Sequence, residues 1–572
     1  MSNKAPNNEW WRGGVIYQIY PRSFQDSNAD GIGDLPGITA RLEHVARLGA
    51  DGIWLSPFFK SPMKDFGYDV SDYRDVDPMF GTLDDFRAFL DAAHARGIRV
   101  ILDLVLNHTS DQHPWFLESR SGRDNPKADW YIWHDVPPNN WQSCFDGSAW
   151  TYAAERGQYY YHYFMKQQPD LNWRNPAVKQ AMWDAVRFWL DMGVDGFRLD
   201  AIGTIYEDPA LTPHKVPMNL AELRHFTETA ATPQARALAS RYFHEMFKHQ
   251  WGGPGLHQLM KELRAILDEY PGDRMLVGED EDIAYMGNGD DELHLVFNFP
   301  LMRVDRITPA HVRRNQRERL ARLDALPVRG WPCNTLGNHD TSRVFTRFGG
   351  DGTHAAELAR LNAALVLTLR GTPFLYNGEE IGMTDLIITD PTKLRDTMAT
   401  WYYRAEVEQL VADPAEAAQR AGAMSRDKNR TPMQWANAAN AGFCPPDVEP
   451  WLPVHPNYAA GVNVADQDAD PSSLLNYYRR LIHVRRNTLA LLAGEYRALD
   501  ERSRDILAFL RQTPEQAVLV VLHYAAKQHH LRLSLPGTAT GKVIFSSHER
   551  EGEVRLDRLP LAPFEVLIAV LT

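Results

Sequence analysis

The stretch that decides the fold is Val194-Asp195-Gly196-Phe197-Arg198-Leu199-Asp200-Ala201-Ile202, a short apolar run into which charged residues are set. Gly193 and Gly203 bound it, and an apolar run of this length predicts a buried strand. Alternation along a strand puts Arg198 and Asp200 on the same side. A buried charge needs a partner. Two interpretations remain open here: a structural Arg–Asp ion pair within a sheet, or a carboxylate nucleophile held ionised by a guanidinium at the end of a barrel strand.

The rest of the chain contains seven more segments of this kind. They are apolar runs with a carboxylate, an amide or a histidine at or just beyond their ends: 15–24, 52–57, 99–108, 275–279, 293–299, 334–340 and 372–380. Polar residues that collect at strand ends are typical of the active face of a barrel with eight parallel strands. The sequence therefore predicts an α/β protein with a (β/α)8 TIM barrel.

Four of these segments resemble the signature regions of a known family, the α-amylase family of glycoside hydrolases. They are Asp103-Leu-Val-Leu-Asn107-His108, Gly196-Phe-Arg198-Leu-Asp200, Gly278-Glu279 and Asn338-His339-Asp340. Gln168-Pro-Asp-Leu-Asn172 also resembles an extra signature of its oligo-1,6-glucosidase and α-glucosidase branch. The resemblance runs from Trp10 to about Leu571.

The resemblance and the changes of pattern along the chain predict its domain organisation. We expect the first part of the catalytic barrel in residues 1–108, and an aromatic-rich inserted domain B in 109–170, after strand 3. The barrel then continues through 171–494 and includes a lid or subdomain at about 384–470. Short alternating runs separated by turn signals predict a C-terminal antiparallel β-sandwich in 495–572.

The composition restricts the partners and the compartment. The chain has 61 Lys and Arg against 74 Asp and Glu, a formal charge of −13, which argues against binding to nucleic acid or an anionic membrane. A neutral substrate is compatible with this charge. Residues 1–14 contain no apolar signal segment, and three widely spaced cysteines fit a reducing compartment. We therefore expect a cytoplasmic monomer or homodimer without a membrane anchor.

A candidate metal loop follows the first strand. In Asp26-Ser-Asn28-Ala-Asp30-Gly-Ile32-Gly-Asp34, oxygen donors recur at every second position, with the backbone carbonyl of Ile32 in the fourth place. Calcium prefers several oxygen ligands from such a loop, although a polar turn before a helix is nearly as good an interpretation. The family resemblance favours a structural calcium or magnesium ion here, with no role in catalysis.

The resemblance also implies the chemistry of the site. Asp200 would be the nucleophile of a retaining glycosidase and Glu279 its general acid and base, while Asp340 would hold the 2- and 3-hydroxyls of the sugar. Arg198 would keep Asp200 ionised. The resemblance places the remaining substrate-binding roles on Tyr68, Asp69, His108, Phe164, His339 and Arg430.

Finer specificity rests on fewer residues. An ion pair between Asp69 and Arg430 would grip the terminal glucose and leave no room for a longer chain on the nonreducing side, which predicts exo-action on maltose and short oligosaccharides. Ala201 follows the nucleophile where enzymes that favour α-1,6 bonds tend to have Val, so we expect a preference for α-1,4 bonds. A transglucosylase, an oligo-1,6-glucosidase or a sucrose-cleaving enzyme on the same site is the alternative. A non-catalytic transporter-associated relative is a remote one, because the three carboxylates are present.

Overall fold

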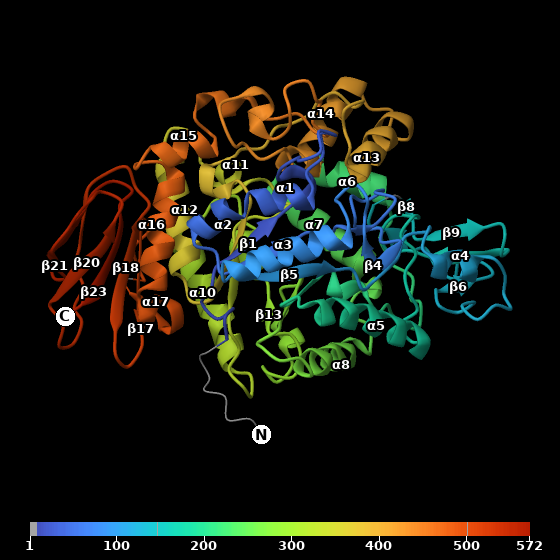
Figure 1. Cartoon of the computed structure of the whole chain (residues 1–572), viewed down its shortest axis with the longest axis horizontal. Coiled ribbons are helices and arrows are strands. Elements are labelled where there is room, and N and C mark those ends of the chain that lie inside the picture. The colour runs from blue at the N-terminus through green and yellow to red at the C-terminus, as the bar shows by residue number, and fades with distance from the viewer. Residues whose placement is uncertain (1–8, 146, 500) are drawn as a thin grey trace.

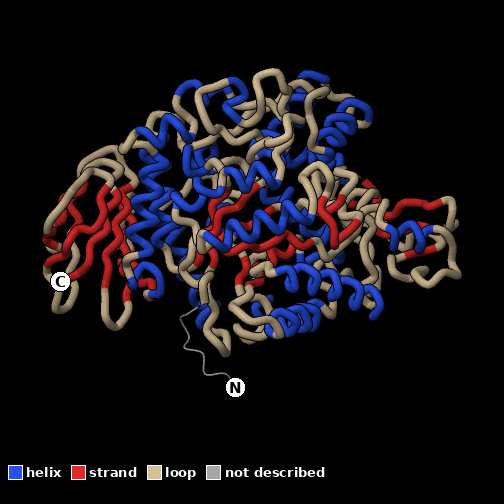
Figure 2. The backbone as a smooth tube through the Cα atoms, in the orientation of Figure 1, coloured by secondary structure: helices blue, strands red, loops and turns tan. Residues whose placement is uncertain are grey.

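The structure, a computed structural model, describes residues 9–145, 147–499 and 501–572; residues 1–8 of the predicted first barrel segment lie outside it. Its central sheet confirms the predicted barrel. The eight parallel strands run in the order β13-β12-β11-β5-β2-β1-β15-β14. They are β1 (Ile16–Ile19), β2 (Gly52–Leu55), β5 (Arg99–Leu104), β11 (Gly196–Leu199), β12 (Met275–Gly278), β13 (Leu295–Val296), β14 (Cys333–Thr335) and β15 (Thr372–Tyr376). Figure 2 shows these strands enclosed by helices.

Helices cover the outside of the barrel between most successive strands. They are α1 (Leu35–Ala40) with α2 (Leu42–Leu48), α3 (Leu83–Ala95), α5 (Pro176–Met192), α8 (Leu256–Asp268), α10 (Pro309–Asp324), α12 (Ala355–Thr368) and α16 (Leu474–Arg486). The apolar spacing from Ile38 to Leu48 is divided between α1 and α2, because Arg41 leaves the helical conformation (φ −102°, ψ 4°). Between β12 and β13 the chain forms only a short 3-10 turn, Ile283–Met286.

Side-chain caps explain where two of these helices begin. Thr82 accepts a hydrogen bond from the backbone of Asp85, whose side chain accepts one from the backbone of Thr82, so α3 starts with a capping box. Asn175 caps α5 and Pro176 occupies its first position, while Gly193 ends the helix in a left-handed conformation.

The segment after β5 forms a small body beside the barrel, drawn at the right in Figure 1. It contains α4 (Pro114–Arg120) and a three-stranded antiparallel sheet in the order β6-β10-β9. Its strands are β6 (Trp133–His134), β9 (Trp150–Ala153) and β10 (Gln158–Tyr161), with a hairpin of β7 (Gln142–Ser143) and β8 (Gly147–Ser148). Many of its aromatic side chains are core residues: Trp141, Trp150 and Tyr161 pack in a cluster that also contains residues between 216 and 247, and others join the main core of the barrel.

Two other bodies complete the chain. The segment above the barrel in Figure 1 contains the predicted lid helices α13 (Thr397–Glu408) and α14 (Pro414–Met424), followed by α15 (Val464–Ala469). The C-terminal body has a six-stranded antiparallel sheet, β16-β17-β18-β23-β20-β21, and a two-stranded second layer, β19-β22. The bounds are β16 (Glu495–Leu499), β17 (Ile506–Gln512), β18 (Ala517–His523), β19 (His529–Leu531), β20 (Thr540–Ser546), β21 (Glu553–Arg555), β22 (Leu559–Leu561) and β23 (Val566–Leu571).

The remaining elements are short or lie in the connections. They are β3 (Phe59–Lys60), β4 (Asp72–Val76), α6 (Leu220–Thr229), α7 (Pro233–Phe247), α9 (Phe299–Met302), α11 (Val344–Phe348) and α17 (Leu489–Ala493). Cys144, Cys333 and Cys444 are buried free thiols. Within the described ranges, no helix is long and apolar enough to cross a membrane.

Trp189 anchors α5 to the barrel and offers a test of this packing. Its side chain is fully buried, stacks on Phe59 with ring centroids 4.8 Å apart, and donates a hydrogen bond to the carbonyl of Tyr73 at 2.7 Å. Trp189→Ala should destabilise the fold by about 3–5 kcal/mol, because it leaves a cavity and an unpaired carbonyl.

Thermal melting of purified variants measures this effect. The adjacent Phe188→Ala is the matched control, since Phe188 is only partly buried and should lower the melting temperature much less. Equal melting temperatures for the two variants would contradict the packing described.

Candidate active site

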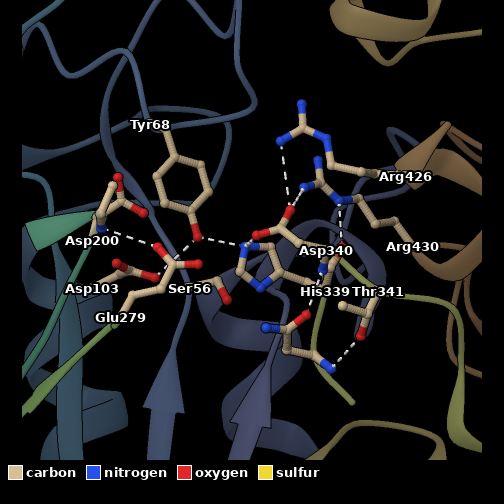
Figure 3. Close-up of polar contacts among 12 residues, drawn as sticks. Ser56, Tyr68, Asp103, Asp200, Glu279, His339, Asp340, Thr341, Arg426 and Arg430 are labelled. Atoms are coloured by element: carbon tan, nitrogen blue, oxygen red, sulfur yellow. Dashed lines mark hydrogen bonds and ion pairs between the residues drawn. The ribbon is translucent and has the colours of Figure 1, made fainter. Parts of the chain in front are cut away.

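Three carboxylates meet one buried arginine at the C-terminal ends of β5, β11 and β12. Nη1 of Arg198 donates to Asp103 at 2.6 Å and to Asp200 at 2.7 Å, and Nη2 lies 2.7 Å from Glu279. The register of the parallel strands explains this meeting. Arg198 on β11 is paired with Asp103 on β5 and with Val277 on β12, and Glu279 directly follows the end of β12. Figure 3 shows Asp103, Asp200 and Glu279 gathered at one end of the site.

One positive charge cannot fully compensate three negative ones. Burial raises the pKa of Asp200, and Glu279 and Asp103 add to that effect while Arg198 opposes it. Burial likewise raises the pKa of Asp103 to about 6 against the influence of Arg198. Arg198 therefore contacts Asp200 as expected, but it does not hold the pKa of that carboxyl below its ordinary value. The cluster retains protons more readily than isolated carboxyls do, and they belong to the group as a whole.

Asp340 stands at the other end of the site among positive charges. Nη2 of Arg430 donates to it at 2.5 Å, and Nη1 of Arg426 lies 3.5 Å away. Burial alone would raise the pKa of Asp340, but His339 and the two arginines together hold it below its ordinary value. Burial lowers the pKa of His339 itself to about 3, and its Nε2 lies 3.2 Å from Asp340.

Tyr68 links the two ends of the site, as Figure 3 shows. Its hydroxyl donates to Asp103 at 3.1 Å and lies 2.5 Å from Nε2 of His339. The amide nitrogen of Gln18 lies 2.8 Å from Nδ1 of His339, which assigns the ring proton to Nε2, on the side of Tyr68 and Asp340. The aromatic side chain and the carboxylates are thus held in one hydrogen-bonded frame.

These groups surround a cavity of about 230 Å³. Its lining residues are Asp65, Tyr68, His108, Phe145, Phe164, Asp200, Ala201, Glu279, Asp340 and Arg426. The structure therefore brings together the three predicted catalytic carboxylates and three of the predicted substrate residues, Tyr68, His108 and Phe164. Arg198 and His339 are fully buried behind the lining. Burial lowers the pKa of His108 to about 3, so it is neutral at pH 7.

The expected ion pair between Asp69 and Arg430 is not formed, and the prediction for Asp69 was wrong in position. Asp69 is fully buried, and its carboxylate accepts hydrogen bonds from Ser61 and from the backbone of Lys64 and Asp65 at 2.9–3.0 Å. It therefore shapes the loop instead of facing the cavity. Burial raises its pKa to about 6.

Asp65 and Arg426 occupy the place predicted for that pair. Nη2 of Arg426 lies 3.0 Å from Asp65, and both residues line the cavity. Arg430 is fully buried, where its Nε donates to the carbonyl of His339 at 2.9 Å, so it supports Asp340 from behind. The observed pair comes from the same loop and the same segment as the predicted one, but it uses a different carboxylate and a different arginine. In each case the residue lies four positions earlier in the chain.

Phe145 and Ala201 complete the lining beyond the predicted set. Phe145, from the tip of the β7–β8 hairpin, lies with its ring 5.3 Å from the guanidinium carbon of Arg426. Ala201 has a left-handed backbone (φ 38°, ψ 47°), which is strained for a residue with a side chain. This conformation lets its N–H donate to Glu279 at 3.0 Å. The only sequence signal for Phe145 was its place in the aromatic-rich insertion.

The predicted metal loop is wound around its own carboxylates. Asp26 accepts from the backbone N–H groups of Asn28, Ala29 and Gly31, and Asp34 accepts from those of Ser27 and Gly37. Asn28 and Asp30 accept from the N–H groups two positions on, Asp30 and Ile32. The oxygen donors suit a hard cation. However, within the described part of the chain no three His, Cys, Asp or Glu side chains are placed to hold a metal ion.

Comparisons with known proteins agree with this geometry. A family model described as the catalytic domain of alpha amylase matches residues 18–494. The oligo-1,6-glucosidase of Parageobacillus thermoglucosidasius is 39% identical over 580 residues and covers 98% of each chain. A probable alpha-glucosidase of Rhizobium meliloti (strain 1021) is 42% identical over 530 residues, covering 91% of this chain and 90% of its own. A crystal structure of a trehalulose synthase variant superimposes with a TM-score of 0.86 at 35% identity, covering 99% of this chain and all of its own.

The chain therefore belongs to the α-amylase family of glycoside hydrolases. Within that family it is one of the α-glucosidase and oligo-1,6-glucosidase hydrolases, enzymes that act on small α-glucosides.

The corrected positions of Asp65 and Asp69 can be tested by one pair of variants. Asp65→Asn should raise KM for maltose roughly tenfold or more, because it removes the charge that holds Arg426 at the cavity wall. Asp69→Asn should change KM much less, because Asp69 bonds only to its own loop, and should mainly lower the melting temperature.

Steady-state kinetics and thermal melting of both variants decide between the two assignments. A large rise in KM for Asp69→Asn at an unchanged melting temperature would restore Asp69 as the residue that grips the sugar.

Proposed function

We propose that the protein is an exo-acting, retaining α-glucosidase that releases terminal, nonreducing glucose from maltose and short oligosaccharides and prefers α-1,4 bonds. The observation that supports it best is a small cavity with two carboxylates on one arginine at one end and the Asp65–Arg426 ion pair at the other. The carboxylates at the first end support the retaining mechanism, and the ion pair at the other end supports exo-action.

The mechanism would use Asp200 and Glu279 in separate roles. Glu279 in its protonated form would donate its proton to the leaving oxygen, while Asp200 would attack the anomeric carbon and form a covalent glucosyl intermediate. Water, deprotonated by Glu279, would then release glucose with its configuration retained. In retaining glycosidases the two carboxyls stand about 5 to 5.5 Å apart. Their shared contact with Arg198 supports such a close spacing.

The other lining groups would bind the sugar in this scheme. Asp340, ionised beside two arginines, would accept hydrogen bonds from the 2- and 3-hydroxyls of the sugar. These hydrogen bonds would strengthen as the ring flattens in the transition state. Tyr68 would lie against the ring face. The arginine and the carboxylate at the closed end would bind the outer hydroxyls of the terminal glucose, so that no further sugar fits beyond it.

The preference for α-1,4 or α-1,6 bonds depends on the part of the cavity near Glu279, where the leaving group would bind. Ala201 lines the cavity directly after Asp200, and its N–H bonds to Glu279, so its methyl group lies near the oxygen to be protonated. A small side chain there resembles enzymes that prefer α-1,4 bonds. Glucosyl transfer or sucrose isomerisation is the second candidate, favoured by the similarity to the trehalulose synthase.

Initial rates on maltose, isomaltose and sucrose, with products separated by chromatography, test the proposal. We expect maltose to be cleaved fastest with glucose as the main product, and Ala201→Val to shift the ratio of maltose to isomaltose rates roughly tenfold towards isomaltose. A wild-type enzyme that prefers isomaltose would overturn the linkage argument, and mainly transfer or isomerised products would favour the second candidate.

A structural divalent cation in the loop from Asp26 to Asp34 is a separate proposal, supported by its oxygen donors alone. If calcium or magnesium binds there, chelation should lower the melting temperature and leave kcat at moderate temperature unchanged, because the loop does not line the cavity. Elemental analysis for about one ion per chain, with Asp30→Ala as the variant that loses it, provides the measurement. A metal-free wild-type protein whose melting temperature does not respond to either ion would contradict the proposal.

A further inference from the structure

Asp396 lies outside the cavity but binds Arg426, one of the residues that line it. The side chain of Asp396 is fully buried, and Arg426 donates to it from Nε at 3.1 Å and from Nη2 at 2.9 Å. The two bonds use different carboxylate oxygens, so the guanidinium meets the carboxylate side-on. The backbone N–H of Arg426 adds a third bond at 2.8 Å. A bidentate pair of this kind fixes the orientation of the arginine as well as its position.

That orientation decides which atoms of Arg426 face the cavity. Nη2 is shared between Asp396 and Asp65, and Nη1 points towards Asp340 at 3.5 Å, as Figure 3 shows for the Asp340 side. The ring of Phe145 lies against the guanidinium. Rotation of Arg426 away from Asp396 would therefore remove Nη1 and Nη2 together from the closed end of the cavity.

Asp396 is held in turn by the start of the lid helix α13. It is the N-cap of this helix and accepts from the N–H of Met398 at 3.2 Å, while its own N–H donates to Asp427 at 3.0 Å. The next residue, Thr397, donates from its hydroxyl to the carbonyl of Lys64 at 2.8 Å, directly before Asp65. One helix start thus contacts both the arginine and the loop that carries its partner.

The charge of Asp396 supports this arrangement. Burial alone would raise the pKa of this carboxyl, but Arg426 holds it below its ordinary value, so the pair is ionic across the range in which a hydrolase is assayed. The buried arginine depends on that charge, because a guanidinium out of water needs an ionised partner.

We propose that Asp396 is a positioning residue for exo-specificity: by fixing Arg426 against Asp65 it keeps the far end of the cavity closed, although it lines no part of that cavity. The inference rests on the proposed exo-glucosidase function and deepens it. It assigns to the lid helix a part in substrate selection that the cavity lining alone does not reveal.

The competing explanation is that Asp396 merely caps α13. Asn is as good an N-cap as Asp, so Asp396→Asn keeps the cap and removes the charge from Arg426. Asp413 offers a matched control in the same lid. It caps α14 by accepting from the N–H groups of Ala415 and Glu416 at 2.9 and 3.1 Å, and it is exposed, with no contact to Arg426.

The experiment is a double-mutant cycle on maltose hydrolysis, with melting temperatures measured in parallel. Asp396→Asn should raise KM roughly tenfold or more with a smaller change in kcat, because a displaced arginine weakens the binding of substrate and transition state alike. Asp413→Asn should leave both constants near the wild-type values. In an Arg426→Gln background, Asp396→Asn should add little further change, because the two residues act through one contact.

The cycle also gives the results that would overturn the inference. These are a wild-type KM for Asp396→Asn, or the same rise in KM with and without Arg426. If Asp396→Asn does not fold, Asp396→Ser, which also preserves a cap, takes its place in the cycle. An oligosaccharide blocked at its nonreducing 4- and 6-hydroxyls separates the two claims: its cleavage by the wild-type enzyme would refute exo-action, whereas the cycle alone decides the role of Asp396.

Discussion

Arg198 carries one positive charge into a fully buried position and meets Asp103, Asp200 and Glu279 there, each within 2.7 Å. Such a position would be prohibitively costly for an unpaired guanidinium, and three carboxylates gathered there without a cation would repel one another strongly. The parallel register of β5, β11 and β12 brings these four side chains from distant parts of the chain to one edge of the barrel. The catalytic arrangement depends on this balance of charge between Arg198 and the three carboxylates.

The excess of negative charge around Arg198 has a chemical consequence. A retaining glycosidase needs one carboxyl that carries a proton and one that does not. Burial and mutual repulsion raise the pKa values of Asp200 and Asp103, whereas Asp340, at the far end of the same cavity, has its pKa lowered by His339 and two arginines. The carboxylates around Arg198 therefore favour keeping a proton within their cluster, which the proposed mechanism assigns to Glu279, so that Asp200 can react as the carboxylate. Asp340, beyond the ring of Tyr68, stays ionised.

The sequence predicted the barrel and the reacting groups because both depend on local patterns. Apolar runs that end in Asp, Glu, Asn or His have the length of buried strands, and alternation predicts that Arg198 and Asp200 share a side. The C-terminal sheet was predicted less completely: β16, β21 and β22 are short and only partly apolar, so they give weak strand signals. The expected pair of Asp69 with Arg430 is absent for a different reason. Which carboxylate of a tight loop turns inward depends on hydrogen bonds within that loop and on a helix cap more than 300 residues away, at Asp396, and neither is visible in a local pattern.

In the proposed mechanism Asp200 forms a covalent bond to glucose, while Glu279 donates the proton to the leaving group and later accepts one from water. The most direct measurement is mass spectrometry of the protein after reaction with a 5-fluoroglucosyl fluoride, which slows the breakdown of a glucosyl intermediate. The account predicts one added fluoroglucosyl group per chain, located on the peptide that contains Asp200 and absent from Asp200→Asn. A stable adduct on another carboxylate, or turnover of maltose by Asp200→Asn at a rate near that of the wild type, would contradict it.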